Sequence, residues 1–371
     1  MKHRGIQLQY HFGPARQRSA EIENPLFDLL AALAAAGSIR HAAERLGVSY
    51  RHFWGSLKAW EQTLGESLVN WERGQPARLT PFAERLLWSE RQARVRLAPH
   101  IETLRRELQR VLDEALDGAS GEVLRVDASH DLMLPALQEL ALQHASLHIE
   151  LRFAGSLDAL RSLAEGRCLV AGFHAPPLPA RTQHYARAVR PMLEPGRHKL
   201  MGCMRRRQGL VVARGNPLGL HGLADLQREV AAGRVRFVRR EAGSGTWLLL
   251  EHLLDGEHLG VDALAQSPTE VSHLAAAHAV ASGQADATLA LEAAAVQCGA
   301  DFVPLADEDY FLVCLADALE TPAVRALRRV LALGEWARLL ATTRGYAPAE
   351  MPGQVLSLTR ALPWWQFRTP R

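Results

Sequence analysis

GSIRHAAERLGVSYRHFW, residues 37–54, decides the fold at the N-terminal end of this chain. Its apolar residues recur at steps of three and four, which indicates helices, and Gly47 interrupts the pattern with a residue suited to a tight turn. Ser38 and Ser49 stand just before the two helical runs, where a serine hydroxyl accepts a hydrogen bond from a free backbone N–H of the first turn. The stretch therefore predicts two helices joined by a turn.

The sequence on either side completes a larger unit. Residues 26–33 carry leucines at helical spacing upstream, and residues 68–71 and 77–79 are short strand-like runs downstream. Between those two runs lies the basic segment 73–76, which predicts a hairpin tip. Three helices followed by a basic hairpin are typical of a winged helix-turn-helix, which we expect to occupy residues 1–79.

The third helix of this unit, residues 50–64, has one apolar and one polar face. Its polar side chains concentrate at the start, the part that a recognition helix presents to base edges in the major groove. Two helices around a glycine turn also occur in bundles that bind no DNA, so the basic hairpin is what favours a DNA interface. The residues expected at that interface are Ser38, Arg40, Ser49, Tyr50, Arg51, His52, Trp54, Lys58, Arg73, Arg78 and Thr80.

The same residues carry a family resemblance. The run from Gly37 through Arg51, together with Trp54 and residues 79–83, resembles the N-terminal domain of molybdate-responsive ModE-type regulators and, more distantly, that of LysR-type regulators. The resemblance covers about residues 20–90 and implies a transcription regulator that binds double-stranded DNA. The hairpin tip is shorter than the glycine-rich wing typical of the ModE type.

One long helix is predicted over residues 80–117, followed by a short Gly-Ala-Ser-Gly linker. Apolar residues recur at steps of three and four from Phe82 to Ala115, which is typical of a packed seam. Pro99 should kink this helix or begin its second half, because proline lacks a backbone donor. Helix-turn-helix proteins usually read paired half-sites, so we expect the seam to join two copies into a homodimer or a dimer of dimers.

The remainder of the chain alternates short apolar runs with amphipathic helices, which indicates a sheet with parallel strands and flanking helices. Two apolar runs, residues 209–213 and 310–316, fall where strands would carry the chain into a second lobe and back. The predicted fold class is α+β multidomain, with a two-lobed α/β domain over residues 118–371. We expect the first lobe at about residues 122–205 and 314–371, and the second at about 206–313.

Three loops at the predicted strand ends carry hydroxyls and small residues just before a helix. Ligands of such sheets bind at the carboxyl ends of the strands, where helix N-termini favour anions. One loop of this kind is ordinary turn chemistry, but three that converge predict a pocket for a compact oxyanion or a carboxylate. The two histidines among them are equally compatible with a surface or cap role. The candidate ligand-binding residues are Ser129, His130, Ser156, Gly243, Ser244, Gly245, Thr246 and His273.

This part also carries a resemblance. Residues 237–246 and 273–287 resemble the type-II periplasmic-binding-protein fold, in particular the PBP-like domain of molybdate- and molybdenum-cofactor-associated proteins, over about residues 122–345. The resemblance implies a small-anion effector such as molybdate or tungstate. A small carboxylate such as formate, or a molybdenum-cofactor-related molecule, is the alternative. Trp247 stands where the resemblance leads us to expect an arginine.

The overall composition narrows the class of protein. The formal net charge is only +3 over 371 residues, so a nucleic-acid site must be local. The four cysteines are scattered and predict neither a zinc site nor disulfides. No apolar run reaches the roughly 18–20 residues of a membrane span, and the first residues do not form a signal core. We therefore expect a cytoplasmic protein without a membrane partner or a cofactor; a cofactor-metabolism enzyme and a transporter's solute-capture component are disfavoured alternatives.

Overall fold

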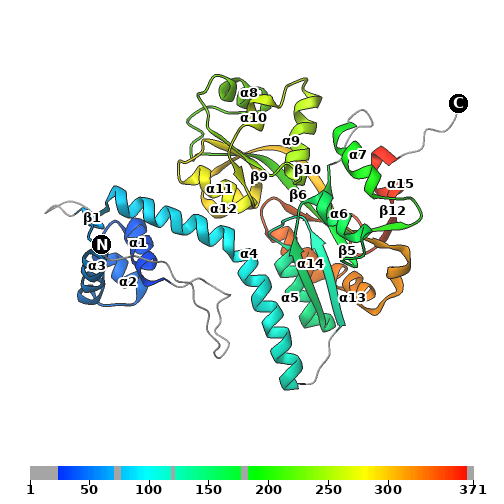
Figure 1. Cartoon of the computed structure of the whole chain (residues 1–371), viewed down its shortest axis with the longest axis horizontal. Coiled ribbons are helices and arrows are strands. Elements are labelled where there is room, and N and C mark those ends of the chain that lie inside the picture. The colour runs from blue at the N-terminus through cyan, green and yellow to red at the C-terminus, as the bar shows by residue number, and fades with distance from the viewer. Residues whose placement is uncertain (1–23, 71–76, 118–121, 177–182, 366–371) are drawn as a thin grey trace.

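The structure is a computed structural model, and it describes residues 24–70, 77–117, 122–176 and 183–365. Its N-terminal domain packs three helices against a two-stranded antiparallel ribbon (Figure 1). These elements are α1 (Pro25–Ala36), α2 (Ile39–Leu46), α3 (Tyr50–Leu64), β1 (Val69–Asn70) and β2 (Arg78–Leu79).

Local signals fix the ends of the three helices. The side chain of Ser38 accepts a hydrogen bond from the backbone of α2, and Ser49 does the same for α3. Gly47 ends α2 with a φ of 68°, a left-handed conformation that glycine adopts without steric cost. The predicted turn between the two helices is therefore confirmed. Phe53 and Leu57, on the opposite side of α3 from its polar start, are buried in the core of the domain.

A single helix, α4 (Pro81–Asp117), leaves this domain and reaches the rest of the molecule. Its first turns contribute Ala83 and Leu87 to the N-terminal core. The helix is continuous and changes direction between its two halves (Figure 1), where a kink at Pro99 was expected. In the second half Leu104, Leu108 and Val111 are exposed. Within one chain, these three side chains of the predicted seam are therefore accessible to solvent.

The C-terminal domain is built on one mixed sheet, which follows the order β4-β3-β5-β10-β6-β9-β7-β8, with β11 and β12 paired to β6. Its strands are β3 (Glu122–Ala128), β4 (Leu147–Phe153), β5 (Val170–Ala175), β6 (His198–Val212), β7 (Phe237–Arg240), β8 (Thr269–Glu270), β9 (Ala287–Leu291), β10 (Asp301–Leu315), β11 (Tyr346–Pro348) and β12 (Val355–Ser357). Strands β3, β4 and β5 are parallel to one another, as are β7, β8 and β9. The predicted α+β multidomain class is confirmed.

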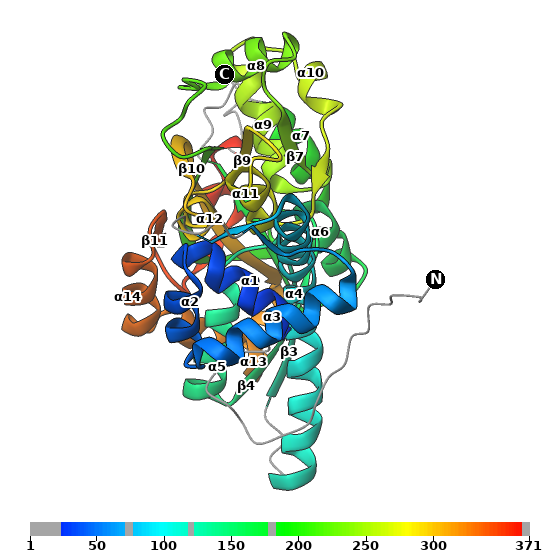
Figure 2. The same ribbon diagram turned by 90° about the vertical axis from the view of Figure 1, so that its left-hand side faces the viewer.

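Helices cover both ends of this sheet. Figures 1 and 2 both place α8 and α10 at one end of the domain and α5 and α13 at the other. The helices are α5 (Leu134–Ala145), α6 (Ser156–Ala164), α7 (Gln183–Val189), α8 (Leu223–Ala231), α9 (Gly245–Gly256), α10 (Asp262–Ala265), α11 (His273–Ala281), α12 (Glu292–Cys298), α13 (Pro322–Leu331), α14 (Gly334–Thr342) and α15 (Leu358–Ala361). None of the helices in the described ranges combines the length and hydropathy needed to cross a membrane.

Two long strands, β6 and β10, lie in the middle of the sheet. We call the part with β3, β4 and β5 the first lobe and the part with β7, β8 and β9 the second lobe. β6 and β10 each have 15 residues and pair with each other along nearly their whole length. The first-lobe strand β5 pairs with residues 309–313 of β10, and the second-lobe strand β9 pairs with residues 208–212 of β6. Residues 309–313 of β10 therefore already lie beside a first-lobe strand, a few residues before the boundary predicted at about residue 314. The apolar run that suggested the crossing is already the first-lobe half of the strand.

Candidate DNA-binding and effector sites

The start of α3 presents several of the predicted DNA contacts on an exposed surface. Tyr50, Arg51 and His52 are all exposed on its first turn, and Trp54 is half-buried beside them. Lys58 lies over the Trp54 ring, 4.8 Å from its centroid, and donates to Glu61 at 2.6 Å. Tyr50, Arg51 and His52 therefore form an exposed polar cluster at the N-terminal end of the helix.

The remaining predicted DNA contacts differ in accessibility. Arg40 is exposed and paired with Glu44 on α2, and Arg78 is exposed on β2. Thr80, in contrast, is buried: its hydroxyl donates to the backbone oxygen of Ser67 at 2.8 Å and accepts from a backbone N–H of α4. Thr80 caps α4 and does not offer its hydroxyl to a DNA surface, because both of its hydrogen bonds are internal. The expected contact Arg73 lies outside the described residues.

At the other site, the loops of the two lobes meet directly. A Cβ added to Gly155, which follows β4, would lie 2.6 Å from the backbone oxygen of Gly243, which follows β7. A Cβ on Gly245, at the start of α9, would lie 1.8 Å from Nε2 of His174 on β5. Both contacts are closer than any real Cβ tolerates, so only glycine lets the lobes approach as they do.

Several predicted ligand-binding residues surround this contact. His130 and His273 come from opposite lobes, and their ring centroids are 6.2 Å apart. The Nδ1 atom of each ring is buried without a hydrogen-bond partner among the described residues, as is the hydroxyl of Ser156 at the start of α6. Thr246 is also buried, in the first turn of α9. The structure therefore brings side chains from three of the predicted loops to one place.

Two of the predicted hydroxyls are occupied by the fold itself. Ser129 donates to the hydroxyl of Tyr310 at 3.1 Å. Ser244 caps α9, since its hydroxyl accepts from the backbone of Trp247 and donates to the backbone oxygen of Glu241. These two serines stabilise the loops, and the donors that remain free belong to other residues.

A buried arginine, Arg206, which was not among the predicted residues, lies at the centre of the site. Nε of Arg206, on β6, donates to Glu308 at 2.6 Å, and its Nη1 donates to Asp131 at 2.8 Å. Glu308 also accepts from Gln208 at 2.7 Å and is bonded to Nδ1 of His174 at 2.6 Å. The side chains of Arg206, Glu308 and Asp131 are fully buried. Nη2 of Arg206 has no partner in the described part of the chain.

The register of the two long strands explains this placement. Arg206 stands opposite Glu308, between two flanking pairs that face the other way because side chains alternate across a strand. The flanking arginines are half-exposed and pair with aspartates on β10. The sequence did contain a signal for this cluster. Three consecutive arginines on one strand face three consecutive acidic residues on another, although about 100 residues separate the two runs. The two flanking pairs are Arg205–Asp309 and Arg207–Asp307.

A second arginine, Arg240, ends β7 and is also buried. Its Nε and Nη2 donate to the backbone oxygens of Glu270 and Val271, at 3.0 and 2.8 Å, and its Nη1 has no partner among the described residues. Arg240 therefore lies on the strand before the loop, whereas the position after Thr246, where an arginine was expected, is occupied by Trp247. Trp247, in that position, is buried in the second-lobe core and donates to Glu251.

Burial and the two arginines set the protonation of the titratable groups. Burial lowers the pKa of His130 to about 3, and the charges of Arg240 and Arg206 act in the same direction. The pKa values of His273 and His174 are lowered by burial too, so all three imidazoles are neutral at pH 7. Burial alone would raise the pKa of Glu308, but Arg206 and His174 bring it down to about 2. Glu308 is therefore a carboxylate.

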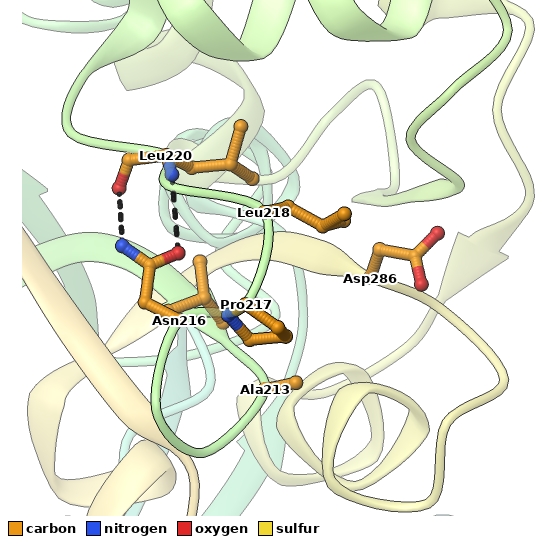
Figure 3. A pocket seen from close by; sticks show the side chains of 7 residues that line it. Ala213, Asn216, Pro217, Leu218, Leu220 and Asp286 are labelled. Carbon is orange, nitrogen blue, oxygen red and sulfur yellow. Dashed lines mark hydrogen bonds between the residues drawn. The ribbon is translucent and has the colours of Figure 1, made fainter.

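A separate hollow in the second lobe is a poorer candidate for a ligand site. It lies between the end of β6 and the following loop, and mostly apolar side chains line it (Figure 3). The amide of Asn216 is bonded to the backbone of Leu220, and Asp286 is paired with Arg236 at 2.7 Å. Its polar side chains already have hydrogen-bond or ion-pair partners. At the contact between the lobes, in contrast, several buried polar atoms of the described residues have none.

Both domains match families of known proteins. Residues 26–84 match the lysR family of bacterial regulatory helix-turn-helix proteins, and residues 137–332 match the PBP superfamily domain. The chain is 32% identical over 234 residues to the uncharacterized protein YvgK of Bacillus subtilis (strain 168). The aligned residues cover 62% of this chain and 71% of that protein. The ModE-type resemblance stays a prediction.

Among solved structures, full-length BenM is 18% identical, with 85% of this chain and 96% of that chain covered and a TM-score of 0.39. Full-length LysG of Corynebacterium glutamicum with bound effector Arg is also 18% identical, with 83% and 96% covered and a TM-score of 0.37. The assignment of this chain to a family rests on the two family matches and on the relative. The chain belongs to the PBP superfamily-domain family and, with its lysR-family helix-turn-helix, is a ligand-responsive, DNA-binding transcription regulator of the LysR type.

Proposed function

We propose that the contact between the two lobes is the effector site and that it takes a small anion. One observation carries this proposal: Nη2 of Arg206 and Nη1 of Arg240 are buried donors without a partner in the described part of the chain. A buried donor left unsatisfied costs about 1–3 kcal/mol, and more when it is charged. An anion placed between the two guanidinium groups recovers that free energy.

The surroundings support an anion as well. α6, α9 and α11 all begin at this contact, and the dipole of a helix favours negative charge at its N-terminus. Ser156 adds a buried hydroxyl without a partner among the described residues. The family resemblance favours molybdate or tungstate; a small carboxylate such as formate or a molybdenum-cofactor-related molecule is the alternative.

Thermal unfolding of the full chain in the presence of each small anion tests this site. A ligand at 100 times its Kd stabilises the folded protein by about 2.7 kcal/mol, which raises its Tm. Arg240→Gln should abolish the shift because it removes one of the two unpaired donors. Arg239→Gln is the matched control, since the Arg239 side chain lies over Trp247 in the second lobe. If no small anion raises the Tm, the proposed effector class is wrong.

The route from this site to the DNA-binding domain runs through α11 and the segment before it. α11 begins at the lobe contact with His273 and ends against α4, where His278 is bonded to Gln92 at 3.1 Å. Just upstream, the backbone oxygen of Glu270 accepts a hydrogen bond from Arg240. Its carboxylate accepts one from Arg96 of α4 at 2.6 Å. We infer that effector binding shifts the population of lobe arrangements and that this segment transmits the shift to α4.

Arg96→Gln should separate sensing from response. Loss of the Arg96–Glu270 ion pair should leave effector affinity unchanged, measured by calorimetry, and reduce the effector-induced change in DNA affinity. Coupling energies between sites are typically about 1–3 kcal/mol, or about 5–150-fold, which sets the scale of the loss. Arg94→Gln is the control, because Arg94 pairs with Glu90 inside α4. Equal coupling in both variants and the wild type would exclude this route.

We further propose that the start of α3 reads DNA. Arg51→Ala should weaken binding to the cognate duplex by about 1–3 kcal/mol, the usual contribution of a specific base contact. The measurement is a titration of labelled duplex at several salt concentrations, because phosphate contacts make binding fall with salt. Arg45→Ala, on the exposed surface of α2, is the control. Unchanged binding by Arg51→Ala contradicts the assignment.

The exposed apolar residues in the second half of α4 are the proposed contact with a second copy. Leu104, Leu108 and Val111 lie on the part of the helix that carries the predicted seam. A pair of chains would present two recognition helices to paired half-sites, and two such pairs would form a tetramer. Sedimentation of the purified protein as a monomer would exclude this. We propose the cytoplasm as its location, since its DNA target lies there.

A further inference from the structure

The charges around the lobe contact already balance before any ligand binds. Arg206 is bonded to two carboxylates, Asp131 and Glu308, so these three groups together carry one negative charge. Arg240 contributes one positive charge and is bonded to backbone oxygens. The four groups therefore sum to zero.

The neighbouring groups do not add positive charge. Because burial lowers their pKa values, His130, His174 and His273 are neutral at pH 7. Two further carboxylates act on Arg240: Glu241, which is exposed, and Glu270, which is paired with Arg96. The site offers hydrogen-bond donors without an excess of positive charge.

The space is also small. The centroids of the His130 and His273 rings are 6.2 Å apart, whereas a carbon atom in contact with both ring faces needs about 7–8 Å between them. The glycine contacts described above hold the two lobes together beside these rings. A ligand that fits this arrangement has few atoms and lies beside the rings, near the two guanidinium groups.

From this balance and this space we propose that the effector is a compact monoanion, such as a small carboxylate, and not a tetrahedral dianion. The inference rests on the proposed small-anion site. A buried charge without a compensating partner is strongly unfavourable, so each additional negative charge on the ligand weakens its binding here. Arg240 supplies the counter-charge for one negative charge, whereas Arg206, the other buried arginine described at this contact, is already paired with Asp131 and Glu308.

Isothermal titration of the full-length protein at neutral pH tests the proposal, with formate, acetate and nitrate as monoanions and molybdate, tungstate and sulfate as dianions. We expect one of the monoanions to bind more tightly than every dianion by about tenfold or more. Tighter binding of a dianion would overturn the monoanion assignment and leave the small-anion site standing. Binding of none of the six would overturn the small-anion site itself.

A variant tests the charge argument directly. Glu308→Gln removes one negative charge with little change of shape, so the ratio of dianion to monoanion affinity should rise by about tenfold. Asp307→Asn is the matched control, because the adjacent Asp307 is exposed and pairs with Arg207 on the other face of the strand. An unchanged ratio in Glu308→Gln contradicts the argument. If that variant does not fold, the wild-type comparison decides alone.

Discussion

Arg206→Met will lower the free energy of unfolding by about 3–5 kcal/mol, because removing one partner from a buried ion pair leaves uncompensated charge in the interior. Here two carboxylates, Asp131 and Glu308, would lose their common cation. Methionine keeps much of the side-chain volume, so a cavity contributes little to the effect. Denaturant unfolding of the full chain, followed by circular dichroism, measures the change.

The neighbouring residues provide unusually close controls. Arg205→Met and Arg207→Met remove the same charge one position away, but these side chains are half-exposed and their ion pairs with Asp309 and Asp307 face solvent. Exposed ion pairs contribute about 0–1 kcal/mol, so both variants should unfold nearly like the wild type. Similar losses in all three variants would show that Arg206 has no special role.

Acid should reduce the difference between Arg206→Met and the wild type. The pKa of Glu308 in the folded protein is about 2, below its ordinary value of 4.5. Its stabilising contribution is therefore complete above pH 4.5 and is lost as the pH falls toward 2. In Arg206→Met the same carboxyl becomes easier to protonate, and protonation relieves the unfavourable buried charge. The difference in unfolding free energy should narrow below about pH 4.5.

Gly245→Ala should weaken effector binding by about 1–3 kcal/mol, or roughly five- to 150-fold, the usual cost of forcing an extra methyl group into a packed site. The added Cβ would lie 1.8 Å from Nε2 of His174. That ring cannot move aside easily, because it is buried and bonded to Glu308. The lobes would have to separate, which moves Arg240 away from Arg206. Calorimetric titration with the anion that binds the wild type measures the loss.

The loop itself supplies the control for this variant. Gly243→Ala adds the same methyl group two residues away, where nothing lies within 4 Å, and should bind the effector normally. Gly155→Ala, whose Cβ would meet the backbone oxygen of Gly243, should behave like Gly245→Ala. Wild-type affinity in Gly245→Ala would mean that the effector does not need the lobes to be in contact.

The helix-turn-helix could be predicted in detail because its determinants are local. Ser38 and Ser49 cap the helices that directly follow them, and Gly47 forms the turn between those helices. The same local chemistry misled the interpretation elsewhere. Thr80 and Ser244 also precede helices, and their hydroxyls cap those helices, so they are not free for DNA or a ligand.

The proposed effector site was only partly predictable, since its charged groups come together through long-range pairing. The loops with Ser156 and His273 follow the general rule for strand ends. Arg206 and Glu308, however, are 102 residues apart in the chain and meet only because β6 and β10 pair in one particular register. A one-residue slip of either strand would turn its side chain to the opposite face of the sheet, away from its partner. Sequence patterns within one strand do not contain that information.

The short length of α11 has a mechanical consequence. Its nine residues span about 13 Å, and a helix of this length behaves as a stiff rod. One end of α11 lies at the lobe contact. The other end is hydrogen-bonded to Gln92 and Trp88 in α4 of the same chain. If α11 transmits effector binding as proposed, the signal passes within one chain over little more than two turns of helix. Each subunit of the proposed dimer would then respond to its own effector, independently of its partner.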